Sequence, residues 1–184
     1  MNPSPERAGV IERLERAKVQ LQDSIDRRLI PFTGFCMVYA IRGARDPGGI
    51  AGMTCRITYD GDKRFCCSPV SFGIDEAGAR IILTAMKTDP VVRSVAILHF
   101  SPLIVEVFGK MFLECCSFDR LREPAGLSTM DWGVASCCRD GVPDVIFDTG
   151  TPDKEGLVRL FGENPDAVAN NIIILSNRIL NIEI

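Results

Sequence analysis

The first 31 residues combine a helix start signal with a helical spacing of apolar side chains. Ser4 offers a capping hydroxyl, and Pro5 is tolerated in the first turn of a helix, where a backbone N–H is not needed. The apolar residues that recur at every third or fourth position are Val10, Leu14, Ala17, Leu21 and Ile25. This spacing predicts a helix over residues 5–28, whose apolar stripe packs on the body of the domain or on a second copy of the chain.

From residue 32 onward, short apolar runs alternate with helical patterns. The runs typical of strands cover residues 34–42, 54–60, 64–70, 93–100, 114–118, 143–149 and 157–161. The segments with helical spacing cover residues 75–87, 102–111, 131–140 and 166–180. Alternation of strands and helices favours a partly parallel sheet, whereas the short turns near residues 61–62 and 150–156 favour antiparallel pairs. We therefore expect an α/β fold with a mixed, partly parallel sheet covered by helices, in which an N-terminal helical extension (1–31) precedes one domain (32–184).

The composition and charge of the chain indicate its protein class and disfavour some kinds of binding partner. The 184 residues are 46% hydrophobic and 24% charged, which is ordinary for one globular domain. No window approaches the roughly 18 apolar residues of a membrane span, and the polar N-terminus does not look like a secretory signal. We expect a cytoplasmic protein without membrane contact. A net charge of −3 without a dense run of Lys and Arg disfavours direct nucleic-acid binding.

The cysteines are numerous for a protein of this kind. Six of the eight stand in adjacent pairs, namely Cys66 and Cys67, Cys115 and Cys116, and Cys137 and Cys138. Neighbouring residues in a strand point to opposite faces, so such a pair is poor geometry for a bridge or for two ligands of one metal. The one histidine, His99, lies inside an apolar run, away from any cysteine cluster. We expect reduced thiols that pack as small hydrophobes, and no metal site.

Four polar loops lie where the predicted strands end or the helices begin, which is where α/β sheets bind ligands. They cover residues 73–78, 117–124, 128–133 and 148–156. Each has a purely structural interpretation as well. Asp75 suits a helix cap, Asp119 with Arg120 and Arg122 suits a surface ion pair, and the segment around Lys154 suits a hairpin turn.

Several long motifs follow one another in a fixed order through these loops. They are GFCMVYAIRGARDPGGIAG (34–52), ARIILTAMKTDPVVRS (79–94), SFDRLREP (117–124), GLSTMDWG (126–133) and GVPDVIFDTGTPDKEGLVRLFGENPDAV (141–168). Together they resemble the ThiN family over about residue 34 to the C-terminus. The leading helix also resembles the helical extension of that family.

The resemblance implies thiamine phosphate synthesis, in which the nitrogen of a thiazole phosphate displaces diphosphate from a hydroxymethylpyrimidine diphosphate. The family's catalytic arginine falls on Arg56. The retained motifs imply substrate-binding roles for Asp119, Arg120, Asp148, Lys154 and Glu155. The expected partner is a small phosphorylated metabolite, and Mg²⁺ would accompany a diphosphate substrate; no other cofactor is implied. A homodimer is compatible with the leading helix.

One family residue is missing. The family's catalytic histidine falls on Ala77, and alanine can neither transfer a proton nor donate a hydrogen bond to phosphate. The preceding Asp75 and Glu76 would also repel diphosphate at a helix start that otherwise attracts anions. Three functions stay open at this point: an active thiamine-phosphate synthase, a non-catalytic protein that binds thiamine phosphate and works with a partner, and an enzyme for another phosphorylated metabolite.

Overall fold

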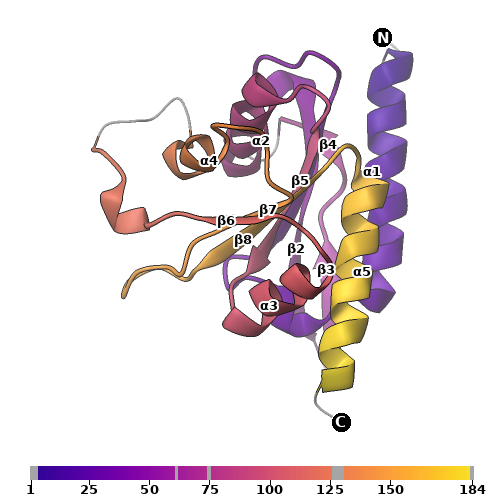
Figure 1. Cartoon of the computed structure of the whole chain (residues 1–184). Helices are drawn as coiled ribbons and strands as arrows, with labels where there is room; N and C mark the ends of the chain where they lie inside the picture. Colours follow the sequence, from indigo (N-terminus) through magenta and orange to yellow (C-terminus); the bar gives the residue numbers. More distant parts are fainter. Residues whose placement is uncertain (1–3, 61, 74–75, 126–130, 183–184) are drawn as a thin grey trace.

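The computed structural model describes residues 4–182, apart from residues 61, 74–75 and 126–130 (Figure 1). The helices are α1 (Pro5–Ser24), α2 (Glu76–Thr88), α3 (Pro102–Lys110), α4 (Trp132–Cys137) and α5 (Pro165–Ile182). The strands are β1 (Phe35–Ala40), β2 (Ile50–Asp60), β3 (Asp62–Cys67), β4 (Ser71–Phe72), β5 (Ser94–His99), β6 (Cys115–Ser117), β7 (Val145–Phe147) and β8 (Leu157–Gly162). Three short 3₁₀ turns, η1 (Arg27–Leu29), η2 (Pro47–Gly49) and η3 (Arg120–Arg122), join them.

The strands form one mixed sheet in the order β3-β2-β1-β5-β8-β7-β6, with β4 paired to the start of β2. Strands β6 and β7 run parallel, and every other described pairing is antiparallel. The predicted α/β fold with a mixed sheet is therefore confirmed. Chain length permits the parallel pair, because the segment between β6 and β7 is long enough to cross over, whereas a single residue separates β2 from β3.

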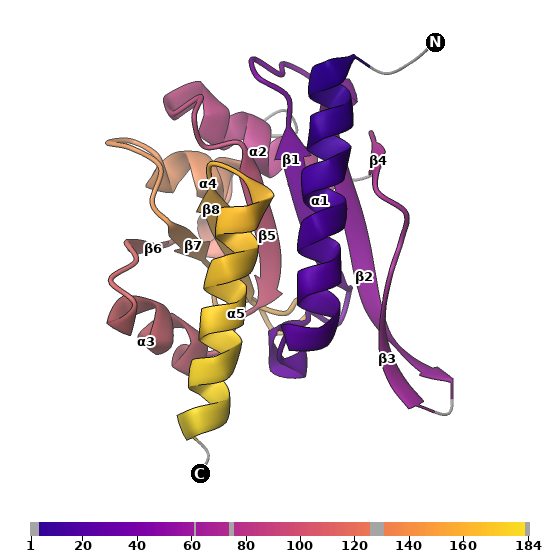
Figure 2. The same cartoon turned by 90° about the vertical axis from the view of Figure 1, so that its right-hand side faces the viewer.

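Each face of the sheet has its own hydrophobic core. Helices α1, α3 and α5 bury their apolar side chains against one face, and α2 and α4 cover part of the other. In Figure 2, α1 lies across β1 and β2, and α5 lies beside it over β5. We call the first face the α1/α5 face and the second the α2/α4 face. No helix in the described ranges is long and apolar enough to cross a membrane.

Helix α1 begins where the sequence predicts but ends earlier. The Ser4 side chain accepts a hydrogen bond from the Arg7 N–H at 3.4 Å, and the helix stops at Ser24 rather than at residue 28. Asp26 explains the early end, because its carboxylate caps η1 by accepting the Arg28 N–H at 2.9 Å. The predicted apolar stripe lies within the core of the α1/α5 face.

The expectation that all cysteines are reduced is wrong for four of them. Disulfides join Cys55 to Cys67 and Cys116 to Cys137. Neither bond joins adjacent cysteines, which agrees with the alternation of strand side chains. The first bond follows from sheet register, because Cys55 of β2 lies directly opposite Cys67 of β3. The second exists because α4 packs close to β6, a tertiary contact across 21 residues of chain.

Candidate active site

The residues proposed from the sequence gather at one end of the sheet, where β2 and β5 end and β1 and β8 begin. Gly34 precedes β1, and Arg56 follows Cys55, which lies opposite Phe35. Cys55 belongs to the core of the α1/α5 face, so its neighbour Arg56 points to the α2/α4 face. His99 points to the same face, since Ile97, two residues earlier in β5, lies in the α2/α4 core. We call this region the site end.

A cavity of about 310 Å³ opens at the site end. Its lining residues are Arg27, Ile30, Pro31, Phe32, Gly34, Arg56 and Ile57. Gly34 has a φ of +108°, and a side chain there would lie 3.2 Å from Cγ of Arg56. The positive φ favours glycine here, and the stem of Arg56 lies close against it. Two arginines, Arg27 and Arg56, are among these lining residues, and planar guanidinium groups bind phosphate oxygens in bidentate pairs.

Glu155 connects the hairpin of residues 148–156 to the wall of this cavity. Its two carboxylate oxygens accept the Phe32 N–H at 3.1 and 2.8 Å. The Phe32 ring lines the cavity on one side and meets the His99 ring edge-on, with 5.5 Å between ring centroids. Nδ1 of His99 lies 4.0 Å from Oε1 of Glu155 and has no hydrogen-bond partner among the described residues. The sequence did not link His99 with Glu155, because the contact joins β5 to a distant hairpin.

Asp148 forms a buried ion-pair cluster beside this hairpin. The carboxylate is fully buried, and its Oδ2 accepts hydrogen bonds from Arg120 and Arg159, both at 2.9 Å. Its Oδ1 accepts the Gly150 N–H at 2.9 Å, which holds the start of the hairpin. The Arg159 guanidinium also lies 5.0 Å from the centre of the Phe118 ring. Asp148 and Arg120, two of the residues proposed from the sequence, are therefore in direct contact. The third member of the cluster, Arg159, was not proposed from the sequence.

Arg159 carried a signal in the sequence that could have been used. It is the one charged residue in the apolar run LVRLF, and its side chain is almost fully buried in the structure. A charge inside a buried strand requires a partner, because an isolated buried charge is very costly. The sequence could not name that partner among the nearby carboxylates.

The other predicted residues are more exposed. Asp119 caps η3 by accepting the Leu121 N–H at 2.9 Å, and its carboxylate lies 3.6 Å from the exposed Arg122 guanidinium. Lys154 is exposed, and its backbone pairs with Thr151 in the hairpin turn. Their roles in substrate binding stay predictions.

Ala77 lies in the first turn of α2 and is exposed. The acidic character predicted for this loop depends on Asp75 and on the side chain of Glu76, which lie outside the described part of the structure. The proposed effect of these two carboxylates on diphosphate therefore stays a prediction.

Comparison with known proteins supports the resemblance to the ThiN family. The family model "Thiamine-phosphate synthase ThiN" matches residues 13–174. The chain belongs to the ThiN family. It is 30% identical over 169 residues to the bifunctional thiamine biosynthesis protein ThiDN of Methanocaldococcus jannaschii, covering 90% of this chain and 40% of that protein. It is 29% identical over 167 residues to the thiamine-phosphate synthase ThiN of Methanothermobacter thermautotrophicus, covering 86% and 88% of the two chains.

Two solved structures share this architecture. The C-terminal domain of protein MJ0236 superposes with a TM-score of 0.86 at 29% identity, covering 97% of this chain and 98% of that one. The C-terminal domain of a phosphomethylpyrimidine kinase superposes with a TM-score of 0.78 at 26% identity, covering 92% and 100%. The chain thus spans two fifths of the ThiDN relative and nearly the whole of the two solved domains.

Proposed function

We propose that this ThiN domain binds thiamine phosphate, or the pyrimidine and thiazole phosphates from which it is made, in the cavity lined by Arg56. The observation that carries the proposal is that two arginines, Arg27 and Arg56, line a cavity of about 310 Å³ at the site end of a ThiN-family fold. That volume lies at the lower end of the range of small-molecule sites. Bidentate guanidinium contacts suit the phosphate that these ligands share.

We further propose that synthesis of thiamine phosphate by this chain is slow. Loss of diphosphate requires stabilisation of the charge that develops on the leaving group, which Arg56 can supply by electrostatic contact. Alanine occupies position 77, where the family's histidine would transfer a proton or donate a hydrogen bond. Mg²⁺ would accompany the diphosphate substrate, because this ion is usually bound through substrate phosphates together with one or two carboxylates.

Calorimetric titration with thiamine phosphate tests the binding site. Arg56→Ala removes a charge-assisted contact worth about 1.5–3 kcal/mol, so affinity should fall roughly 10- to 150-fold. The matched control is Arg139→Ala, which removes an exposed arginine just beyond α4. If the wild-type chain does not bind thiamine phosphate, or if both variants bind it as the wild type does, the cavity assignment is wrong.

Incubation with both precursors and Mg²⁺, followed by mass detection of thiamine phosphate, tests turnover. We expect very little product from the wild-type chain, and little recovery in Ala77→His, because the neighbouring Asp75 and Glu76 remain. Rapid turnover by the wild-type chain would contradict the proposal of slow synthesis. In that case His99→Ala and Glu155→Gln would show whether the pair beside Phe32 replaces the missing histidine.

A further inference from the structure

A second polar cavity lies at the end of the sheet opposite Arg56. The Arg56 cavity includes Gly34, just before β1, whereas this one includes Tyr39 near the end of β1 and Arg42 two residues after it. Six residues of strand separate the two ends, which is roughly 20 Å. Two hollows of about 440 and 500 Å³ adjoin here, and both are lined by Arg13, Tyr39, Arg42 and Arg93. We call them together the arginine cavity.

Its three arginines come from three separate elements and converge on one space. Arg13 projects from α1, Arg42 from the loop after β1, and Arg93 directly precedes β5. Arg93 is held in place, because its guanidinium donates to the Tyr39 hydroxyl at 2.6 Å and to the Ala40 carbonyl at 3.1 Å. It also lies 4.8 Å from the centre of the Tyr39 ring, and only 16% of its side chain is exposed. These contacts fix the position of the guanidinium before any ligand binds, which lowers the entropy cost of binding.

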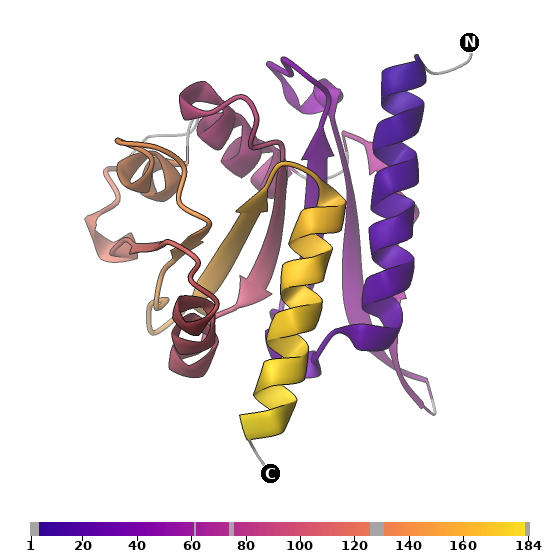
Figure 3. The ribbon, with the colours of Figure 1, turned by 45° about the vertical axis from the view of Figure 1, so that its right-hand side comes forward.

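Two helix N-termini add partial positive charge to the same cavity. Helix α1 begins at Pro5, and its residues Glu6 and Gly9 line the cavity. Helix α5 begins at Pro165, and its capping residue Asn164 lines the adjoining hollow. Figure 3 shows the two helices starting at the same end of the molecule and running side by side. The dipoles of both helices, whose first turns are capped by Ser4 and Asn164, favour an anion at this end.

Carboxylates at the arginine cavity reduce its positive charge but do not neutralise it. Glu6 and Glu163 line the cavity beside the three arginines, which leaves an excess of positive charge. The Glu6 carboxylate accepts the Arg42 N–H at 2.7 Å and lies 3.9 Å from the Arg93 guanidinium. Asp166 lies 3.9 Å from Arg13 but pairs more closely with Arg16, at 3.1 Å. Glu6 therefore occupies donors that an anionic ligand would use.

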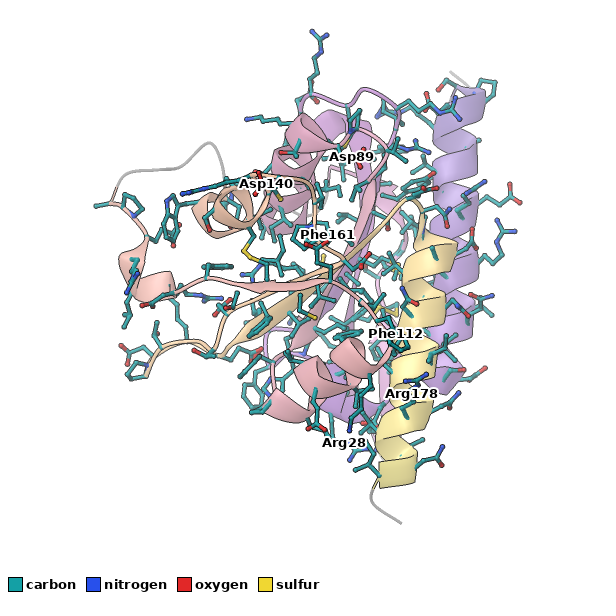
Figure 4. The ribbon with its side chains drawn as sticks, in the orientation of Figure 1. Arg28, Asp89, Phe112, Asp140, Phe161 and Arg178 are labelled. Carbon is teal, nitrogen blue, oxygen red and sulfur yellow. A yellow bond between two sulfur atoms is a disulfide. The ribbon has the colours of Figure 1, made fainter. Side chains whose placement is uncertain are left out.

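An apolar wall completes the cavity on the side of α2. Pro90 and Val91 line it, and Val91 is half exposed. Their turn is held by Asp89, labelled in Figure 4, whose carboxylate accepts the Val91 N–H at 2.9 Å. A ligand with a phosphate at the arginines thus has apolar surface available for the rest of the molecule.

We propose that the arginine cavity binds the phosphate group of a small phosphate ester, with Arg42 and Arg93 as its main contacts and Arg13 as a further one. Guanidinium forks bind phosphate oxygens in bidentate pairs. The inference does not depend on the proposed function, because the two cavities share no lining residue. The wall formed by Glu6, Gly9 and Val10 also precedes the segment that the ThiN family model matches.

The test uses the Arg56→Gln chain, so that binding at the site end is removed first. Glycerol 3-phosphate and inorganic diphosphate are titrated separately, with affinity from calorimetry and location from backbone amide shifts in NMR spectra. We expect saturable binding of glycerol 3-phosphate that shifts the amides of Arg42 and Gly43. Arg42→Gln should weaken it about tenfold or more, the effect of one charge-assisted contact, without disturbing the fold, because this side chain is exposed.

The matched control is Arg45→Gln, which removes the same charge three residues later in the same loop but does not line the arginine cavity. It should change the affinity less than twofold. Glu6→Gln should strengthen binding several-fold, since it removes the competing carboxylate while keeping an oxygen for the Arg42 N–H.

Three results would overturn the proposal: no saturable binding at millimolar glycerol 3-phosphate, equal losses in Arg42→Gln and Arg45→Gln, or binding present in the wild type and abolished by Arg56→Gln alone. Tighter binding of diphosphate than of the ester, with the same response to Arg42→Gln, would show a site for the free anion and would likewise reject the ester. Absence of binding, or equal losses in Arg42→Gln and Arg45→Gln, says nothing about thiamine phosphate binding in the Arg56 cavity. Loss through Arg56→Gln alone would reject the arginine cavity and support the Arg56 cavity, so the two proposals can fail separately.

Discussion

Asp148 is a buried carboxylate that holds two arginines, and its replacement by asparagine should destabilise the fold strongly. Its Oδ2 accepts hydrogen bonds from Arg120 and Arg159 at 2.9 Å, and 5% of the Arg159 side chain is exposed. Asparagine keeps the shape but removes the negative charge, which leaves the Arg159 charge buried with a weaker partner. Breaking a buried ion pair in this way costs about 3–5 kcal/mol. That is a large part of the roughly 5–15 kcal/mol by which folded domains are stable.

Urea unfolding at pH 7 measures this loss through the change in the free energy of unfolding. Arg120→Met should cost less, about 1–3 kcal/mol, because Arg120 is more exposed and Arg159 still pairs with the carboxylate. The control is Asp119→Asn, which alters an exposed ion pair with Arg122 and keeps a capping side chain, so it should cost less than about 1 kcal/mol. A decrease in the free energy of unfolding below about 1 kcal/mol for Asp148→Asn would refute the reasoning, because ion pairs on the protein surface contribute no more than that.

Three further outcomes follow from single features of the structure. Gly34→Ala should weaken thiamine phosphate binding, measured by calorimetry, because φ is +108° there and a methyl group would press on the Arg56 stem; unchanged affinity would contradict this. Thiol titration in denaturant without reductant should find four free thiols, and eight after reduction; eight in both samples would contradict the two disulfides. The Arg28 side chain, which donates hydrogen bonds to Asp26, holds the pKa of that carboxyl below its usual 3.8. The stability that Asp26 provides should therefore be complete above that pH and be lost as pH falls below it, so urea midpoints of the wild type and Asp26→Asn should converge in acid; a constant difference would contradict the pairing.

Much of the fold could be read from local patterns. The start of α1 at Ser4 and Pro5 was predictable because helix capping depends on a few adjacent residues. Its end was not, because Asp26 starts a separate turn and its N–H donates to Ser176 of α5 at 3.0 Å. The hairpin of β2 and β3 was also local, but the parallel pairing of β6 with β7 depended on a crossover that spacing alone does not specify.

The candidate site divides in the same way. The order of the motifs was enough to assign the chain to the ThiN family, and the family-model match confirms that assignment. Arg56 and Glu155 were proposed from this resemblance. Their arrangement was not in the motifs, since Glu155 reaches the cavity wall through a hydrogen bond to the backbone of Phe32, more than a hundred residues away in the chain. The approach of His99 to Glu155 is likewise a tertiary contact between a strand and a hairpin.

By itself, then, the sequence determined the mixed α/β class, the ThiN family, the starts of the main helices and the absence of a histidine at position 77. These properties depend on residue identity and on the spacing of residues close in the sequence, both of which the sequence gives directly. Only the tertiary structure decided which cysteines pair, which arginines share the Asp148 carboxylate, and that Arg13, Arg42 and Arg93 line one cavity. Those contacts depend on strand register and on helices packed across the sheet, and one residue of slip in a strand would turn each side chain to the opposite face.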